Sequence, residues 1–146
     1  ICDRAFMLCK FLRSVHIPKS VTSICYEAFA SCWLLDSIAL PESVETIEGR
    51  AFMWSGLSSI QIPRSVVSFG GNFFIECRHI KKIDVSENPS CAFVKGVLFS
   101  KEKTQIVFCR QTKYGRYSIP KTVTTICAAA FYGCTYLESI RIPKSL

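Results

Sequence analysis

The sequence predicts a β-rich repeat solenoid, and three observations lead to that fold class. The chain has 146 residues, of which 49% are hydrophobic and 20% charged, a composition typical of one compact domain. Five of its six prolines stand in an Ile-Pro or Leu-Pro pair, and a phenylalanine recurs at a fixed distance from those pairs. The interval between regular neighbours is 22–23 residues, which is the length of a solenoid coil that packs only on the coils beside it.

The repeat can be followed as columns of equivalent positions. The proline pairs begin at Ile17, Leu40, Ile62, Ile119 and Ile142. The phenylalanine column contains Phe6, Phe29, Phe52, Phe74 and Phe131. An aliphatic column contains Val15, Ile38, Ile60, Ile83 and Ile140. The third coil has one residue fewer than the other regular coils. Coils stacked about 4.8 Å apart turn each column into a row of core side chains. We therefore expect the phenylalanines to be buried and Ile38, Ile60 and Ile83 to lie on successive strands of one parallel sheet.

One segment departs from the repeat. Residues 85–118 lack the phenylalanine column, and they contain β-rich runs at Val94–Ser100 and Thr104–Cys109 around a polar loop, which predicts a β-hairpin. We therefore divide a single domain, residues 1–146, into regular coils over 1–84, an irregular unit over 85–118, and a regular coil with the start of the next over 119–146. Because the chain starts inside one coil and stops as another begins, without polar capping repeats, we expect a fragment of a longer protein.

Two stretches give the repeat a specific resemblance. IPKSVTSICYEAFASCWLLDSIALP and IPKTVTTICAAAFYGCTYLESIRIP are similar to the BspA-type leucine-rich repeat. The resemblance covers residues 1–85 and 119–146, and GVLFSKEKTQIV is similar to a hairpin that this family often inserts. It implies a right-handed leucine-rich-repeat superhelix with a parallel β-sheet on one face and one irregular coil that contains a hairpin. It also implies a cell-surface protein that acts in adhesion or other protein binding, with a host-surface or matrix protein as ligand.

Seven of the nine cysteines fall in two columns, which favours a packing role. These are Cys9, Cys32, Cys77 and Cys134 in one column, and Cys2, Cys25 and Cys127 in the other. Side chains of one in-register column point the same way, so disulfides along it are not expected, and a line of thiols does not converge on a metal. We expect the first four to be reduced and slow to react. Cys91 and Cys109 lie outside the columns, and we expect no bond between them.

The sequence carries little that suits catalysis. A thiol nucleophile needs a nearby histidine, and only His16 and His79 exist. His79 lies two residues from Cys77, but Cys77 belongs to the core column, where apolar surroundings make a thiol inert. His16 occupies an outward strand position, and we expect both histidines at the surface. There is no phosphate-binding glycine loop and no nucleophile elbow. We expect no enzyme, no cofactor and no metal.

The candidate binding surface is the outward row of the strands, because a solenoid holds such a row on one rigid face. Its variable positions are His16, Ala39, Gln61, Asp84 and Arg141. The residues directly after the repeat prolines are mostly basic, and we call this row the basic file: Lys19, Glu42, Arg64, Lys121 and Lys144. It could bind an anionic glycan, or it could serve only as a solvated surface that prevents aggregation.

The partner classes follow from charge and composition. The net charge of +7 favours anionic partners, but nucleic acid is not expected because the phenylalanines are committed to the core. No uncharged stretch reaches the ~18 residues of a membrane span. The alternative function is an intracellular protein-binding scaffold of the same fold, located in the cytoplasm.

Overall fold

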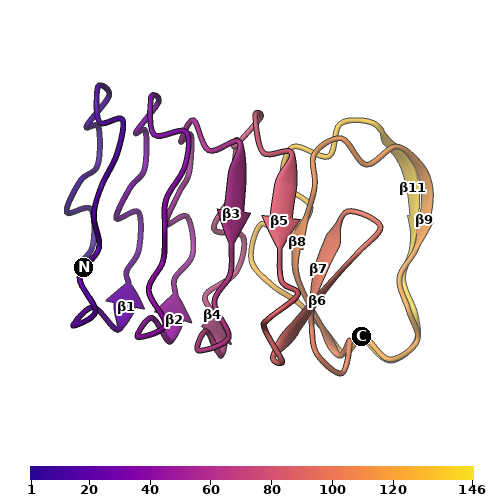
Figure 1. Cartoon of the computed structure of the whole chain (residues 1–146). Coiled ribbons are helices and arrows are strands. Elements are labelled where there is room, and N and C mark those ends of the chain that lie inside the picture. The colour runs from indigo at the N-terminus through magenta and orange to yellow at the C-terminus, as the bar shows by residue number, and fades with distance from the viewer.

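The structure, a computed structural model, describes residues 1–146. It is a β-solenoid of about five turns with coils of about 23 residues, and it contains parallel strands and no helix (Figure 1). The coils stand side by side from the indigo N-terminus to the yellow C-terminus (Figure 1). The predicted fold class is therefore confirmed.

The strands are short and form four separate sheets. A parallel ladder joins β1 (Ser23–Ile24), β2 (Thr46–Ile47) and β4 (Ser68–Phe69). A second parallel ladder joins β3 (Ser59–Gln61) and β5 (Lys82–Asp84). The third sheet has the order β10-β8-β7-β6, with β6 at Cys91–Val94, β7 at Val97–Ser100, β8 at Gln105–Cys109 and β10 at Thr125–Ile126. The last ladder pairs β9 (Gly115–Ser118) with β11 (Leu137–Arg141).

Turns recur in every regular coil, and they limit the length of the strands. In most regular coils the residues two before and two after the column phenylalanine have positive φ, as at Glu27 (φ 55°) and Ser31 (φ 60°) around Phe29. Between them, backbone bonds alternate between the coil itself and the next coil: Ala30 N donates to Glu27 O at 3.0 Å, and Phe29 N donates to Ala51 O at 2.8 Å. Each left-handed residue other than glycine costs about 1–2 kcal/mol, so stacking of the coils must hold these turns in place.

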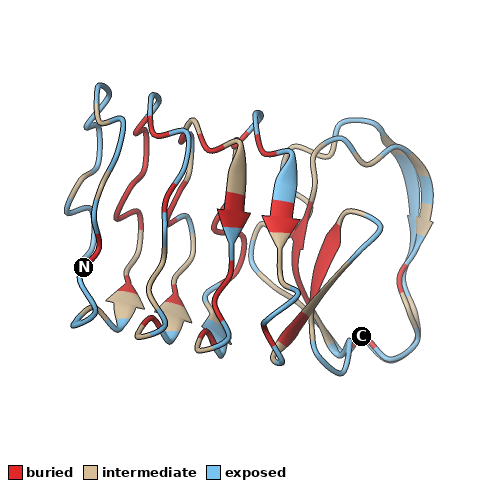
Figure 2. Ribbon diagram, in the orientation of Figure 1, coloured by how far each residue is buried: buried red, intermediate tan, exposed pale blue.

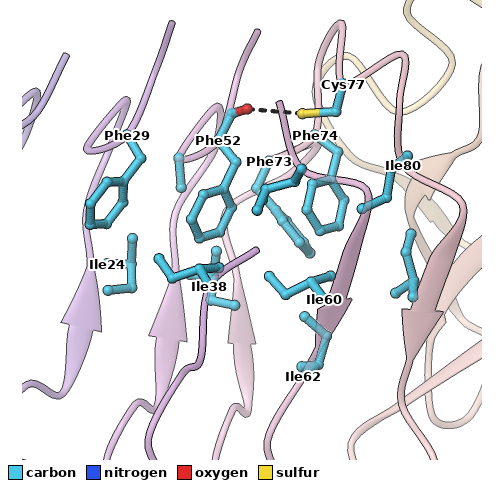
Figure 3. Close-up of a cluster of buried hydrophobic side chains, with 14 of the residues drawn as sticks. Ile24, Phe29, Ile38, Phe52, Ile60, Ile62, Phe73, Phe74, Cys77 and Ile80 are labelled. Atoms are coloured by element: carbon cyan, nitrogen blue, oxygen red, sulfur yellow. Dashed lines mark hydrogen bonds between the residues drawn. The ribbon is translucent and has the colours of Figure 1, made fainter. Parts of the chain in front are cut away.

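The phenylalanine column forms the spine of the core. The rings of Phe6 and Phe29 stack with centroids 5.2 Å apart. Those of Phe29 and Phe52 are 5.8 Å apart, and those of Phe52 and Phe74 are 6.0 Å apart (Figure 3). Phe29, Phe52 and Phe74 are buried as predicted. Phe6 and Phe131 are only partly buried, because Phe6 lies in the first coil and Phe131 in the last complete one, where one side of the stack is less covered.

The irregular unit continues this spine with a different residue. Phe108, from β8, meets the Phe74 ring edge-on at 5.5 Å and is 1% exposed. The register of β7 and β8 shifts between Leu98 and Phe99, which leaves Val107 as an extra residue. This bulge lets Val107 and Phe108 both join the larger core cluster, while Phe99 faces a smaller second cluster. The sheet thus separates two hydrophobic clusters and contributes to both.

Two hairpins shape this unit. The predicted hairpin is present as β7 and β8, whose antiparallel pairing is confirmed. A second hairpin, which the sequence interpretation missed, pairs β6 with β7 through the two-residue turn Lys95-Gly96. Both turn residues have positive φ, 49° and 82°, as a type I′ hairpin turn requires. On the other side β8 pairs in parallel with β10, so the regular repeat resumes directly against the hairpin.

Side-chain hydrogen bonds tie neighbouring coils at both edges. At the proline edge, three serines of the Pro-x-Ser motif donate to the valine carbonyl of the coil before them: Ser43 to Val21, Ser65 to Val44 and Ser145 to Val123, all at 2.7 Å. Asn88 takes the place of that serine in the irregular unit and donates to Val66 O at 2.9 Å. At the opposite edge the Cys77 thiol donates to Phe52 O at 2.9 Å (Figure 3).

The expectation of one parallel sheet needs correction. Ile60 and Ile83 are buried and paired in register in β3 and β5, but Ile38, although buried, lies outside any strand, so the predicted single sheet is divided into short ladders. The sheet is also interrupted at its other end, because β11, which carries Ile140, pairs with β9 and not with β5. The sheet is divided because most residues of each coil lie in turns or in segments outside any strand.

Candidate binding surfaces

The predicted outward row is mostly exposed but is not continuous. His16, Ala39, Gln61 and Arg141 are exposed, and Asp84 is half-buried. The structure places Gln61 beside Asp84 through the β3–β5 register. It places Arg141 in the separate β9–β11 ladder, opposite Ser118, at the far end of the molecule (Figure 1). The row therefore offers one contiguous pair and three more separated side chains.

Local contacts engage the only carboxylate of that row. The Asp84 side chain accepts hydrogen bonds from the Ser86 hydroxyl at 2.7 Å and the Ser86 amide at 3.0 Å, and Lys82 Nζ lies 3.2 Å away. The Ser86 bonds, and then Lys82, lower the pKa of Asp84 to about 2. Asp84 is thus a fixed negative charge and not a proton donor near neutral pH.

The basic file forms a second surface at the proline edge. Its residues are all exposed: Lys19, Glu42, Arg64, Lys121 and Lys144. None of them belongs to a salt bridge of the structure. Exposed charges of this kind attract polyanions, and salt screens them over a distance of about 8–10 Å.

The opposite edge, which we call the turn edge, carries exposed aromatic side chains that sequence reasoning missed. It consists of the turns that follow the phenylalanine column, and Cys77 marks it in Figure 3. Phe11 is 85% exposed, Tyr136 67%, Trp33 55% and Trp54 49%. Large apolar groups gathered along one edge commonly mark an interaction site.

A one-residue deletion opens a notch in this edge. The other regular coils have two residues between the cysteine-column position and the next leucine or isoleucine, whereas the third coil has only Gly56 between Ser55 and Leu57. Gly56 is required there, because a Cβ would collide with the Trp33 carbonyl oxygen. The resulting tryptophan notch has a volume of about 410 Å³ and is lined by Trp33, Trp54, Ser55, Gly56, Glu76, Arg78 and His79. The missing residue was visible in the sequence, but its consequence depends on how the neighbouring turns stack.

A second hollow, the Arg110 cavity, adjoins the notch. Its volume is about 340 Å³, and it shares Glu76 and Arg78 with the notch. It lies where the irregular unit meets the regular coils, with Phe74, Phe108 and Tyr136 among its lining residues. Arg110 Nε and Gln111 Nε2 are buried and have no hydrogen-bond partner. Leaving such a donor unpaired costs about 1–3 kcal/mol, so these two atoms favour a ligand that brings acceptors.

The thiols divide into inert and accessible groups. Cys32 and Cys77 are buried, and desolvation raises the pKa of each to about 11. Cys9, which we expected to be packed in the same column, is exposed, and Cys134 is half-buried. All nine cysteines are free. Cys91 and Cys109 are buried in the irregular unit, and hydrogen bonding with Cys134 together with burial raises the pKa of Cys109.

The one buried carboxylate is fully paired. Glu27 is 5% exposed. Its carboxylate accepts hydrogen bonds from Arg4 Nε at 2.8 Å and from Arg50 Nη1 at 3.4 Å. The Arg4 hydrogen bond is the main cause that lowers the pKa of Glu27. The Tyr26 ring lies beneath both guanidinium groups, at 5.6 and 5.7 Å. This cluster therefore links three coils and leaves no free general acid.

The structure offers no assembled catalytic or metal centre. Both histidines are exposed, as predicted. No group of three or more His, Cys, Asp and Glu side chains is placed to hold a metal ion. No helix is long and apolar enough to cross a membrane. The surface presents aromatic faces, charges and hydrogen-bond donors.

Stacked coils with a repeated aromatic core and exposed edges define the class of leucine-rich-repeat solenoids. The BspA type leucine rich repeat region matches this chain in 6 copies, over residues 1–117 and 104–146. The chain therefore belongs to the BspA-type leucine-rich-repeat family. Members of this family are typically non-enzymatic structural or binding modules. Among curated proteins none matches the chain.

Solved structures of bacterial proteins share the fold. A leucine-rich cell surface protein from Faecalibacterium prausnitzii is 28% identical with a TM-score of 0.80, and the match covers 98% of this chain and 45% of that one. The pneumococcal vaccine antigen PcpA is 27% identical with a TM-score of 0.78, covering 100% of this chain and 43% of that one. A leucine-rich-repeat protein of T. pallidum is 26% identical with a TM-score of 0.57, covering 98% and 51%. The chain thus spans about half the length of these proteins or less.

Proposed function

We propose that this chain is a non-enzymatic protein-binding module of a cell-surface protein and that it acts in attachment to host-surface or matrix proteins. The observation that carries the proposal is the rigid stack of coils, which holds exposed side chains of successive coils at fixed spacing. Rigid presentation lets several weak contacts add without an ordering cost for each. Similarity to a cell surface protein and to a vaccine antigen supports the surface location.

The outward row is the proposed contact surface for the protein ligand. Gln61 is its centre, because it is exposed and lies beside Asp84 in a paired ladder. His16 and Ala39 extend the row toward the N-terminus, and Arg141 adds a positive charge at the far end of the molecule. An extended partner is needed to reach Arg141, since the irregular unit separates it from Asp84.

One observation favours the alternative, an intracellular scaffold of the same fold. The chain has nine cysteines and all are free, whereas proteins of oxidising compartments usually hold structural cysteines as disulfides. A reducing cytoplasm or an anaerobic habitat would each suit this pattern. Locating the parent protein on intact cells by surface labelling separates the two functions.

The test of the binding function uses a triple variant, His16→Ala with Gln61→Ala and Arg141→Ala. All three residues are exposed, so the variant is expected to fold, as circular dichroism will show. Binding to immobilised matrix proteins should fall at least tenfold, a loss of about 1.4 kcal/mol. A matched triple change in the basic file, Lys19, Arg64 and Lys121 to glutamine, should preserve binding at physiological salt. Unchanged binding by the first variant would refute the row, and no binding by the unmodified chain would refute adhesion.

A further inference from the structure

We propose that the turn edge holds a separate binding site for an acidic polysaccharide, one whose sugar rings carry carboxylates. The site joins the tryptophan notch to the Arg110 cavity. It does not depend on the protein-binding row, since the turn edge includes none of the row's residues.

The notch supplies the stacking surface. Trp33 and Trp54 come from adjacent coils, and each leaves about half of its surface to solvent, at 55% and 49%. The face of an indole is electron-rich, so it attracts the polarised C–H groups on the face of a sugar ring. Glu76, Arg78 and His79 line the same notch and offer hydrogen bonds to ring hydroxyls. Aromatic walls with a few polar groups are the usual lining of a small-molecule site.

The Arg110 cavity supplies the positive charge and the unpaired donors. The guanidinium of Arg110 is held in place, because its Nη2 donates to Lys81 O at 2.7 Å and it lies over the Phe93 ring at 5.5 Å. Its Nε has no partner, and neither has Gln111 Nε2. A carboxylate accepts two such hydrogen bonds, and a bond from arginine to a carboxylate is stronger than one between neutral groups.

Glu76 and Arg78 line both hollows, so the two lie side by side and one polymer can reach both. The Arg78 Nε donates to Glu76 Oε2 at 2.7 Å, so the only acid at the junction is neutralised. Arg110 therefore carries the one uncompensated charge of the site, and it favours an anionic ligand, in agreement with the net charge of +7. A chain of sugar rings fits this combination, because it presents apolar faces and carboxylates at regular intervals.

The chain contains its own reporter for this site. It has two tryptophans, and both line the notch, so tryptophan emission reports on nothing else. We would titrate the full 146-residue chain with polygalacturonate and with hyaluronan, and with neutral dextran for comparison. The expected result is a blue shift of the emission and protection from acrylamide quenching with both acidic polymers and not with dextran.

Variants then assign the contacts. Trp54→Ala should weaken binding about tenfold or more, with Trp33 as the remaining reporter, and Gln111→Leu should weaken binding severalfold. Arg110→Lys keeps the charge but removes the Nε donor, so it should also weaken binding. Phe11→Ser, an exposed aromatic of the same edge outside the notch, and Lys121→Gln in the basic file serve as matched controls that should bind normally. Thermal melts confirm folding of each variant.

Several outcomes would overturn the site. Equal responses to dextran and to the acidic polymers would remove the need for charge, and no response to either acidic polymer would remove the ligand class. Loss of binding in Lys121→Gln as large as in Gln111→Leu would indicate a general polyanion effect. An emission change with a matrix protein alone would indicate a protein partner in the notch. The His16, Gln61 and Arg141 variant should retain polysaccharide binding, so this site and the protein-binding row can fail independently.

Discussion

Ser65 shows how a single small side chain connects one coil to the next. Its hydroxyl donates to Val44 O at 2.7 Å, which satisfies a carbonyl group that the turn leaves free. Asn88 makes the equivalent bond to Val66 in the irregular unit and also donates to Pro63 O at 2.6 Å. The amide of asparagine is longer than a serine hydroxyl, which lets the chain enter the irregular unit without losing this connection.

We predict that Ser65→Ala lowers the free energy of unfolding by about 1 kcal/mol, because the variant leaves the Val44 carbonyl without its hydrogen bond. Ser20→Ala is the matched control. Ser20 occupies the same motif position in the first coil, is exposed, and makes no such bond, so its change should be within about 0.5 kcal/mol of zero. Urea unfolding of both variants gives the comparison. Equal losses of unfolding free energy in the two variants would show that the serine stabilises its own turn and not the contact with the coil before it.

The buried thiols give a dependence of stability on pH. Burial raises the pKa of Cys77 from its ordinary 9.0 to about 11. Between these values the unfolded chain has lost the thiol proton while the folded chain retains it, so the unfolded chain binds fewer protons and stability falls as pH rises from about 9 to about 11.

We therefore predict that Cys77→Ala unfolds with a weaker pH dependence in this range than the unmodified protein. Cys2→Ala changes an exposed thiol and should follow the unmodified protein. Urea midpoints at pH 8.5 and 10.5 measure the difference. A Cys77→Ala variant that is as sensitive to alkaline pH as the unmodified chain would contradict the account.

Pulsed alkylation tests the same burial without changing pH. Cys9 is exposed and should react with iodoacetamide in the native protein. Cys32 and Cys77 are buried and should react only after denaturation. Mass spectrometry of peptides from native and denatured protein identifies each site. Rapid labelling of native Cys77 would show that the turn edge opens far more often than its packing indicates.

At the scale of the element, β8 decides how the solenoid tolerates an inserted segment. The strand has two partners, the antiparallel β7 and the parallel β10. Through its bulge it directs Phe108 against Phe74, in the layer where a column phenylalanine is missing. A hairpin thus replaces one coil while the aromatic spine continues.

We predict that Phe108→Ala lowers the free energy of unfolding by about 3–5 kcal/mol, as expected for a fully buried phenylalanine. Phe131→Ala should cost less, since Phe131 is only partly buried. Guanidinium unfolding of both variants gives the values. A small effect of Phe108→Ala would mean that the spine ends at Phe74 and that the irregular unit is attached loosely.

The sequence predicted the columns well and the details between them poorly. Spacing alone identified Phe29, Phe52 and Phe74 as core residues, because a period needs only counting. Spacing did not identify Phe108, since a bulge shifts its position and no repeat marks it. The left-handed residues, such as Glu27 and Ser31, were also missed, because their conformation is imposed by stacking and not by glycine. The tryptophan notch required both the missing residue at Gly56 and the neighbouring turns, which only the fold brings together.

At the scale of the whole molecule, the solenoid presents three distinct surfaces on one core. The outward row, the basic file and the turn edge lie on different sides or edges of the same coils, and Figure 2 shows buried segments between exposed turns. Each surface is assembled from residues about 23 positions apart, so no local stretch of sequence contains a whole site. This arrangement allows the surfaces to bind different partners, and it requires the coils to stay stacked.

We predict that residues 85–118, as part of the solenoid, join its two hydrophobic clusters into one cooperative unit. Hydrogen exchange at increasing urea, followed by mass spectrometry, measures whether the two clusters unfold together. Peptides containing Phe52, in the larger cluster, and Ile106, in the smaller one, should lose protection together, and Phe108→Ala should separate the two transitions. Two separate transitions in the unmodified protein, with the Ile106 region opening at clearly lower urea, would contradict it.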